Sequence, residues 1–340
     1  MHTGSNYTLK EVLYWTRKDI YFLLMIATVP TVMYKVFNWY WLAIPWLPLA
    51  LLGTAVAFMV GFKNNSAYDR VWEARKIWGG IVNSSRSWGI MVKDYITNRH
   101  AEQKMSSEEL HQLHLRILNR HFAWLTALRF QLREPKMWEA IYKSHNAEYK
   151  NAFFKVEEHN EKLEDIIKPY LSEEEYADVM SKTNKPAQII ALQSSHLREL
   201  LEAGYIEDLR HMELQKMLVE FYNLQGASER IKNFPYPRQF ATLSLWFIHI
   251  FVILLPLGMF QEFNKVGEHF VWLTIPFAAL SSWIFTTMDK IGEATENPFE
   301  GSANDIPITA MSRAIEIDLL EIINEPHSLK PITPVNRIIT

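Results

Sequence analysis

The sequence has no cysteine, which excludes disulfides, thiolate nucleophiles and cysteine-ligated metals. It also lacks an excess of positive charge, because 35 Lys and Arg residues stand against 38 Asp and Glu residues, for a net charge of -3. No segment is dense enough in Lys and Arg to predict a nucleic-acid-binding surface. The 340 residues suffice for one large domain or two smaller ones.

The common catalytic motifs are missing as well. There is no Walker A loop, no GxGxxG, no GxSxG elbow and no HExxH pattern in the sequence. His111 and His114 are three residues apart and His121 follows two helical turns later, but no acidic residue completes a zinc-binding pattern. We expect these histidines to lie on the surface of a polar helix, and we predict neither a metal site nor an enzyme.

Charged residues are absent from three long segments, and a fourth has only Lys35 near its end. The segments are 20–37, 36–62, 239–261 and 270–288. A helix of about 20 apolar residues spans the hydrocarbon core of a bilayer. We therefore predict four transmembrane helices, since four such windows rarely coexist as buried helices of a soluble protein. The first segment lacks a cleavage site and is followed at once by the second, which indicates a retained anchor and not a signal peptide.

Most basic residues that flank these segments lie on one side, and only Lys35 and Lys265 lie on the other. The former precede the first and third segments and follow the second and fourth: Lys10, Arg17, Lys18, Lys63, Arg70, Arg75, Lys76, Arg230, Lys232, Arg238 and Lys290. By the positive-inside rule, both termini and the long middle segment are expected in the cytoplasm. Trp39, Tyr40 and Trp41 then mark the outer interface.

The middle of the chain, 63–238, has the apolar spacing of helices and no strand-like alternation. Ser106 to Glu109 and Ser172 to Glu175 have the pattern of capping boxes. The helices predicted here are 64–98, 107–131, 135–159, 173–181, 185–203 and 206–231, with another near 307–325. The predicted organisation is 1–62 with the first two spans, 63–238 as a helical cytoplasmic domain, 239–289 with the last two spans, and 290–340 as a cytoplasmic turn, helix and tail.

In the segment 51–78, an apolar span continues into a charged amphipathic stretch without a helix breaker. We expect one long helix that leaves the membrane. Thr54, Phe58 and Phe62 recur every four residues and so share one face, which on spacing alone favours packing against a neighbouring helix. Beyond them, Glu73 is expected to pair with Arg70 and Lys76 on a solvated or subunit-contacting face.

The stretch ENPFEGSANDIP, 296–307, forms a polar turn behind the fourth span. We expect Gly301 to adopt an unusual backbone angle, and Asn304, Asp305 and Pro307 to form a turn and cap for the next helix. A divalent-cation loop is the alternative, because oxygen-rich turns suit Ca²⁺. Only Glu296, Glu300 and Asp305 bring charge to it.

Several segments together resemble the bacterial branch of the bestrophin family. They are YDRVWEARKIWGGIVNSSR after the second span, ERIKNFPYP before the third, and ENPFEGSANDIPI ahead of IEIDLLEII. The resemblance implies an all-α membrane protein, a homopentameric ion channel in which each subunit adds four transmembrane helices and a helical cytoplasmic domain around a central pore. The stretch 97–200 contributes little to it.

The resemblance also implies positions for a pore. Three residues of the second span line a hydrophobic neck in this family, and through the shared Gly61 and Phe62 these positions are Thr54, Phe58 and Phe62. The stripe is therefore interpreted as pore-lining, with the Thr54 hydroxyl making the outer ring easier to wet. A second constriction at the cytoplasmic exit is assigned to Leu209, with Ile206 close behind.

Eukaryotic bestrophins carry a run of aspartates after Asn-Pro-Phe, which forms a clasp for Ca²⁺. Here the run is replaced by Glu300 to Asp305 with only two acidic residues, so no tight Ca²⁺ site and no other cofactor is expected. The turn remains a candidate gating element. Its residues are Asn297, Pro298, Phe299 and Asp305.

The expected function is passive conduction of small monovalent ions, chloride or other anions first, in the bacterial inner membrane. The expected partners are further copies of the chain, membrane lipid and the ions, with no nucleic acid. A sodium-conducting channel of the same fold, and a membrane-anchored helical scaffold or regulator without conduction, stay open as alternatives. A membrane enzyme comes third.

Overall fold

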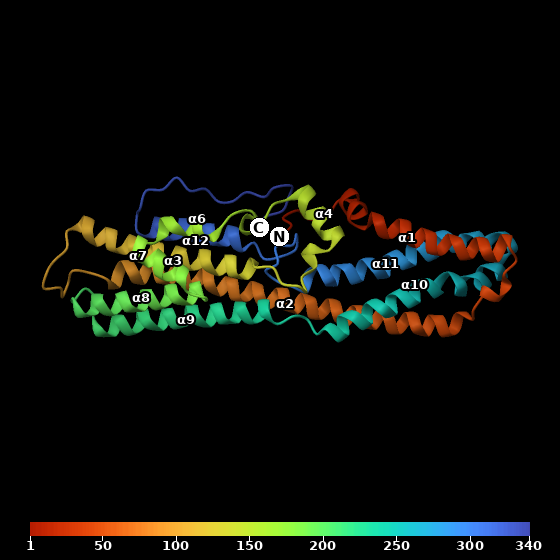
Figure 1. The fold of residues 1–340 in the computed structure, drawn as a ribbon, viewed down its shortest axis with the longest axis horizontal. Helices are drawn as coiled ribbons and strands as arrows, with labels where there is room; N and C mark the ends of the chain where they lie inside the picture. The colour runs from red at the N-terminus through yellow and green to blue at the C-terminus, as the bar shows by residue number, and fades with distance from the viewer.

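The computed structural model describes residues 1–340 as an elongated, all-helical molecule (Figure 1). Its only β-structure consists of two isolated bridges, His2 with Ile338 and Val335 with Ile338. This confirms the predicted all-α class. The helices form two halves along the long axis, called here the apolar half and the polar half.

The helix α2 (Trp46–Tyr95) runs through both halves without interruption (Figure 1). Its 50 residues confirm that the second span and the following charged stretch form one helix. Pro48 lies in the first turn, where a missing backbone N–H costs nothing. Gly53 lies where α10 (Arg238–Val266) crosses α2. A Cβ at this position would come within 2.8 Å of the Phe251 ring, so glycine allows the close approach of the two helices.

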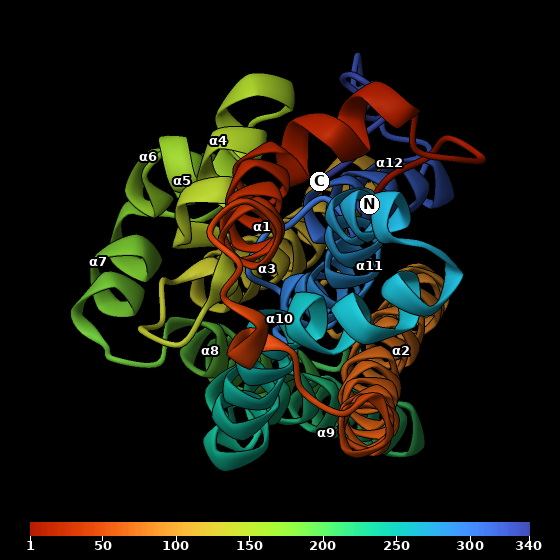
Figure 2. The same ribbon diagram turned by 90° about the vertical axis from the view of Figure 1, so that its right-hand side faces the viewer.

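The apolar half contains α1 (Leu9–Val36), the first part of α2, α10 and α11 (Thr274–Thr295). The chain has four helical segments that are long and apolar enough to cross a membrane. Figure 2 looks onto this end, where α11 packs against α1, α2 and α10. Ten buried side chains, Phe251 and Leu23 among them, form the core between these helices. Two 3-10 turns, η1 (Tyr40–Leu42) and η4 (Glu268–Leu273), lie in the connections at the far end.

The polar half combines the second part of α2 with α3 (Ser107–Arg133), α8 (Lys185–Glu202), α9 (Asp208–Asn233) and α12 (Ile308–Ile322). Its core has 33 buried residues, including Trp78, Trp88 and Trp124. Both predicted capping boxes are present, at the start of α3 and of α7 (Glu173–Ser181). The helix predicted near 307–325 is confirmed as α12.

The helix predicted over 135–159 is wrong. The chain there forms η2 (Ala140–Tyr142), α4 (Ser144–Phe153) and α5 (Glu157–Asn160), followed by α6 (Leu163–Ile167) and η3 (Lys168–Tyr170). The backbone N–H groups of Ala140 and Ile141 donate to the Glu300 carboxylate instead of to carbonyls one turn back. A contact distant in sequence therefore replaces the helical hydrogen bonds.

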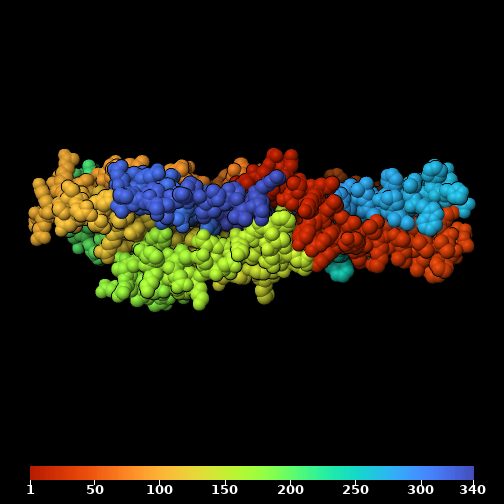
Figure 3. All heavy atoms as spheres, turned by 90° about the horizontal axis from the view of Figure 1, so that it is seen from above, coloured from red at the N-terminus to blue at the C-terminus, as the bar shows by residue number.

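The two chain ends meet near the junction of the halves (Figure 1). The Thr3 N–H donates to the Arg337 carbonyl at 2.7 Å, and the Ile339 N–H donates to the Met1 carbonyl at 2.9 Å. Figure 3 shows the C-terminal segment lying along the face of the polar half until it reaches the N-terminal segment. The N-terminal segment and the tail therefore form one surface layer next to the turn 296–307.

Candidate functional site

The stripe formed by Thr54, Phe58 and Phe62 is exposed along one face of α2. Phe58 is 66% exposed and Phe62 is 69% exposed, although both lie in an apolar helix. The Thr54 side chain is also exposed, and its Oγ1 donates to the Ala50 carbonyl at 2.9 Å. The stripe does not pack against another helix of this chain, so whatever faces it lies outside the chain.

The opposite face of α2 is fixed inside the subunit. Val56 and Val60 are buried in the core of the apolar half. One turn past Val60, the Lys63 ammonium donates to the Asp289 carboxylate of α11 at 2.8 Å, and both side chains are about 5% exposed or less. A buried ion pair of this kind is costly to break from one side. It holds the rotation of α2, and with it the direction in which Phe62 points.

Sequence reasoning missed this pair. From the sequence, Lys63 is predicted only to be a flanking positive charge, because its partner lies 226 residues away. The one available signal was that Asp289 directly follows an apolar segment. A carboxylate at that position requires a buried cation or a route to water.

The charged face beyond the stripe differs from the prediction. Arg70 donates to the carbonyls of Ile231, Phe234 and Glu296, at distances of 2.7 to 3.1 Å. It thereby satisfies carbonyls that the helix ends leave without partners. Glu73 pairs with Arg230 of α9 at 2.7 Å. The predicted pairs of Glu73 with Arg70 and Lys76 are wrong, because long side chains at a helix junction reach neighbouring helices.

Of the two residues assigned to an exit constriction, only one is exposed. Leu209, in the first turn of α9, is 77% exposed. Ile206 is 3% exposed and belongs to the core of the polar half. Ile206 lies just before α9 and is packed inside the polar half. Of the two residues, only Leu209 is therefore free to face an aperture.

The turn 296–307 folds around the Asp305 carboxylate. Its Oδ1 accepts the N–H groups of Phe299 and Ile306, at 2.9 and 2.7 Å, and its Oδ2 accepts the Gly301 N–H at 2.7 Å. Gly301 has φ of 84°, which confirms its predicted unusual angle, and Phe299 has φ of 72°. The predicted helix cap is wrong: α12 begins behind Pro307 without a side-chain cap, because Asp305 serves the turn itself.

Arg133, at the end of α3, supplies the positive charge that balances the Asp305 carboxylate. Its guanidinium donates to Asp305 Oδ2 at 2.6 Å, and both side chains are almost fully buried. Glu158 lies beside it and accepts from Arg129 at 2.7 Å and from Thr309 at 2.6 Å. Burial alone would raise the pKa of Glu158, but Arg133 and Arg129 hold that pKa below its ordinary value. No local pattern in the sequence predicts that α3 reaches the turn.

Several other groups of the turn are buried. Phe299 is fully buried beside Trp78, and Asn297 is 6% exposed, with Pro298 between them in the chain. The Glu300 carboxylate accepts two backbone N–H groups from η2, and burial raises its pKa well above the ordinary value, with Asp305 and Glu139 adding to the shift. The turn is thus a closed polar core and not a solvated loop.

The Asp305 carboxylate leaves no open position for a Ca²⁺ ion. Calcium takes 6–8 oxygen ligands, whereas both oxygens of Asp305 already accept N–H groups. A cation there would also lie against the Arg133 guanidinium.

The histidines of α3 have internal partners. His111 Nε2 lies 2.6 Å from a Glu325 oxygen, His114 contacts the Ile96 carbonyl and His121 contacts the Ser85 hydroxyl. His114 and His121 are buried, so the expectation that they lie on the surface is wrong. They face the core side of α3, where the Nε2 atom of each ring has one polar neighbour. Burial lowers the pKa of His121 to about 3, which keeps its ring neutral.

Comparison with known proteins decides the family. Residues 9–321 match the family model described as bacterial and fungal bestrophin protein. The chain belongs to the bestrophin family. It is 26% identical to the voltage-dependent anion channel-forming protein YneE of Escherichia coli K12, over 84% of this chain and 80% of that one. It is 25% identical to the similarly named RSc3414 of Ralstonia nicotianae, over 82% and 78% of the two chains.

Solved structures share the fold of this bestrophin-family chain. A bacterial bestrophin homologue from Klebsiella pneumoniae is 22% identical with a TM-score of 0.72, and the match covers 93% of this chain and 100% of that one. A structure described only as a membrane protein gives a TM-score of 0.75 at 21% identity, over 92% and 100% of the chains. The resemblance drawn from the sequence is confirmed, the chain is a membrane protein, and it is not an enzyme.

Proposed function

We propose that this chain is one subunit of a homopentameric channel that conducts small monovalent ions, with chloride or other anions preferred. The observation that carries the proposal is the exposed stripe of Thr54, Phe58 and Phe62, on a helix whose other face is fixed by the Lys63–Asp289 pair. The names of the relatives, which call them anion channel-forming proteins, support the ion class.

In this proposal, five copies of the stripe face one axis and form the neck. Rings of Phe58 and Phe62 make a constriction that water leaves easily, while the Thr54 hydroxyl keeps a lone pair for water beside its bond to the Ala50 carbonyl. Ions shed part of their hydration at the two phenylalanine rings and then enter a wider vestibule. They leave past Leu209, which is exposed at the start of α9.

The edges of aromatic rings are partially positive and their faces partially negative. Ring edges turned toward the axis favour anions, and this is the arrangement we propose. The channel lies in the bacterial inner membrane with both termini in the cytoplasm, in contact with lipid and with the other subunits. The turn 296–307 acts without a tightly bound Ca²⁺ or another cofactor, because Arg133 supplies the positive charge beside Asp305.

The neck is tested by replacing Phe58 and Phe62 with alanine together and recording currents in planar bilayers. Wider, less apolar rings should raise the conductance. A matched control replaces Phe22 and Phe277, which are 52% and 50% exposed on α1 and α11 and are expected to face lipid. If both double variants conduct like the parent protein, the stripe does not line the pore.

Two further measurements separate the proposal from its alternatives. Reversal potentials in asymmetric NaCl should follow the chloride equilibrium potential, and a shift toward the sodium potential would replace the anion assignment by the cation one. The mass of the detergent-solubilised complex should correspond to five subunits of 39.9 kDa. A monomer or dimer without ion flux in liposomes would favour a membrane-anchored scaffold.

A further inference from the structure

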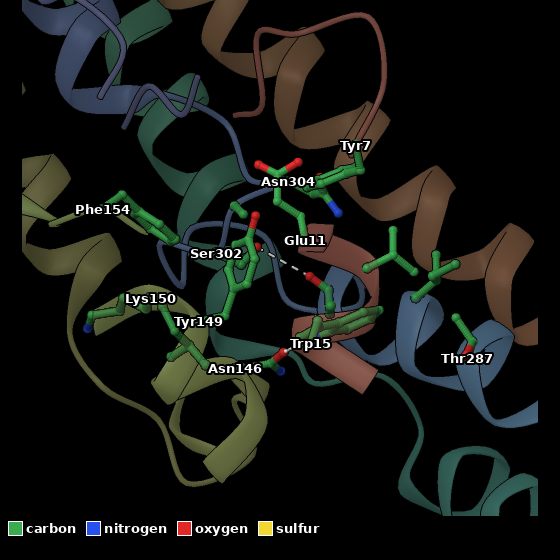
Figure 4. Close-up of a pocket in the computed structure, with 15 residues that line it drawn as sticks. Tyr7, Glu11, Trp15, Asn146, Tyr149, Lys150, Phe154, Thr287, Ser302 and Asn304 are labelled. Atoms are coloured by element: carbon green, nitrogen blue, oxygen red, sulfur yellow. Dashed lines mark hydrogen bonds between the residues drawn. The ribbon is translucent and has the colours of Figure 1, made fainter. Parts of the chain in front are cut away.

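A cavity of about 270 Å³ lies where the start of α1, α4, the end of α11 and the turn 296–307 meet (Figure 4). Nine of its 15 lining residues are hydrophobic. Trp15 and Phe154 supply aromatic walls, and Ile291 and Ala303 supply aliphatic ones. A mostly apolar concavity with a few convergent polar groups is the usual form of a small-molecule site.

The polar groups of this cavity include hydroxyls without a partner. The Tyr149 side chain is 7% exposed, yet its buried hydroxyl has no hydrogen-bond partner, and the same holds for the Thr287 hydroxyl. Leaving such a group unpaired is unfavourable, because its hydrogen bond to water is lost without replacement. Burial, with the nearby Glu11 charge, raises the pKa of Tyr149 to about 12, so its phenol stays neutral and keeps its proton. The Tyr149 hydroxyl is therefore available to a ligand.

The charge of the cavity is negative at one end. Glu11 uses its Oε2 in the Thr8 capping box, with bonds of 2.6 Å from the Thr8 N–H and hydroxyl, while its Oε1 takes no part in the box. Figure 4 shows the Glu11 carboxylate close to Tyr7 and Asn304, where the Tyr7 hydroxyl donates to Asn304 Oδ1 at 2.7 Å. An acceptor-rich end with aromatic rings beside it suits a cation.

The basic residues around the cavity are already engaged. The amino group of Lys150 lies 3.0 Å from His159 Nδ1, and in Figure 4 it is directed away from the other lining side chains. Arg17 and Lys18 both pair with Glu148 outside the lining. Arg337 and His2 lie near enough to Glu11 to lower its pKa, but neither lines the cavity, so no cation of the chain occupies the space beside Glu11.

We propose that this cavity binds a small amphipathic amine, with an aromatic or aliphatic body between Trp15 and Phe154 and its ammonium group at Glu11 and Tyr149. Such a ligand would also touch Ser302 and Asn304 of the turn 296–307. It would bridge the N-terminal segment and the turn. The site is complete within one subunit and does not depend on the proposed pore.

The test is isothermal titration of the full-length protein, purified in detergent, with three probes of similar shape. These are 2-phenylethylamine, the neutral 2-phenylethanol and the anionic 3-phenylpropionate. The amine should bind about tenfold more tightly than the alcohol, because a charge-assisted hydrogen bond is added, and the carboxylate should not bind. Equal binding of amine and alcohol, tighter binding of the carboxylate, or no binding of the amine would each overturn the proposal.

Variants locate the binding. Glu11→Gln keeps the capping box, since Gln also serves there, but removes the charge. It should lose the preference for the amine over the alcohol. Ala303→Leu fills the cavity and should abolish binding of both probes. The matched control is Glu109→Gln, which alters the equivalent capping box of α3 far from the cavity and should bind like the parent.

A further variant addresses the unpaired hydroxyl of Tyr149. Tyr149→Phe preserves the stacking of this ring on Phe153, where the centroids are 4.6 Å apart, and removes only the Oη atom. It should weaken amine binding severalfold without lowering the thermal unfolding midpoint. If Glu11→Gln and Tyr149→Phe both keep parent affinity for the amine while remaining folded, the amine binds elsewhere and the proposed site is wrong.

Discussion

The stripe on α2 and the turn 296–307 are built in opposite ways. The stripe leaves Phe58 and Phe62 about two-thirds exposed, with no partner in the chain. The turn buries Phe299, Glu300 and Asp305 almost completely and satisfies Asp305 with three backbone N–H groups and Arg133. One region is complete in a single subunit, whereas the other acquires its surroundings only in an assembly or a membrane.

This difference separates stability from function along the chain. Substitutions in the turn should act first on folding, because Asp305, Arg133 and Glu300 are buried and hydrogen-bonded to other parts of the chain. Substitutions in the stripe should act on conduction and leave folding nearly unchanged, because no packing inside the subunit is lost. The following predictions test this contrast.

The largest effect is expected at the buried ion pair between Arg133 and Asp305. Arg133→Met leaves the Asp305 carboxylate buried without its cation and should lower the free energy of unfolding by about 3–5 kcal/mol. Thermal unfolding followed by circular dichroism measures it. Arg198→Met is the control, because Arg198 pairs with Glu202 on the surface and such pairs contribute little. Equal midpoints for the two variants would contradict the role of Arg133.

A pair of phenylalanines compares the two regions directly. Phe299→Ala removes a fully buried ring and should cost about 3–5 kcal/mol. Phe58→Ala removes an exposed ring and should change stability by less than about 0.5 kcal/mol. The two are measured side by side by thermal unfolding in the same detergent. A large loss for Phe58→Ala would mean that the stripe is packed against something in the purified state.

The pH dependence of stability reports on Glu300. Its folded pKa is raised above the ordinary 4.5, so the folded state keeps a proton that the unfolded chain releases. The resulting stability is complete below about pH 4.5 and is lost as the pH rises through the folded pKa. Glu300→Gln should flatten this part of the profile and be more stable than the parent at high pH.

Unfolding midpoints measured between pH 4 and pH 9 give both profiles. The exposed Glu134→Gln serves as the control and should retain the parent slope. A Glu300→Gln profile parallel to that of the parent would mean that Glu300 is ionised in the folded state.

The smallest effect is expected at Thr54. Thr54→Val replaces the hydroxyl by a methyl group of similar size and should make the outer ring harder to wet. An added barrier of about 0.5 kcal/mol would reduce single-channel current roughly twofold. Stability should not change. An increase in current would place Thr54 outside the conducting path.

The sequence predicted most of the fold, because helix periodicity and charge-free segments are local signals. The four spans, the continuous α2, both capping boxes and α12 were read directly from residue spacing. The stretch 135–159 was misread, since its conformation depends on Glu300, about 160 residues away. Local propensity contains no information about such a contact.

The candidate sites divide in the same way. Helical spacing alone places Thr54, Phe58 and Phe62 on one face, but it favoured packing against a neighbouring helix, and the interpretation as pore-lining came from the family resemblance. The partners Arg133 and Asp289 were not identified, since pairing of Asp305 with Arg133, or of Lys63 with Asp289, depends on how helices cross. The cavity at Trp15 and Tyr149 was missed for the same reason, as its walls come from four separate parts of the chain.

The unbroken course of α2 limits how the molecule can change shape. A helix of 50 residues is about 75 Å long and has no proline beyond its first turn to act as a hinge. A tilt of about 5° around its middle would move each end by about 3 Å, which is the order of an atomic diameter. The phenylalanine rings and the polar half therefore lie on one continuous helix, and a tilt of the whole helix that moves one end displaces the other in the opposite direction.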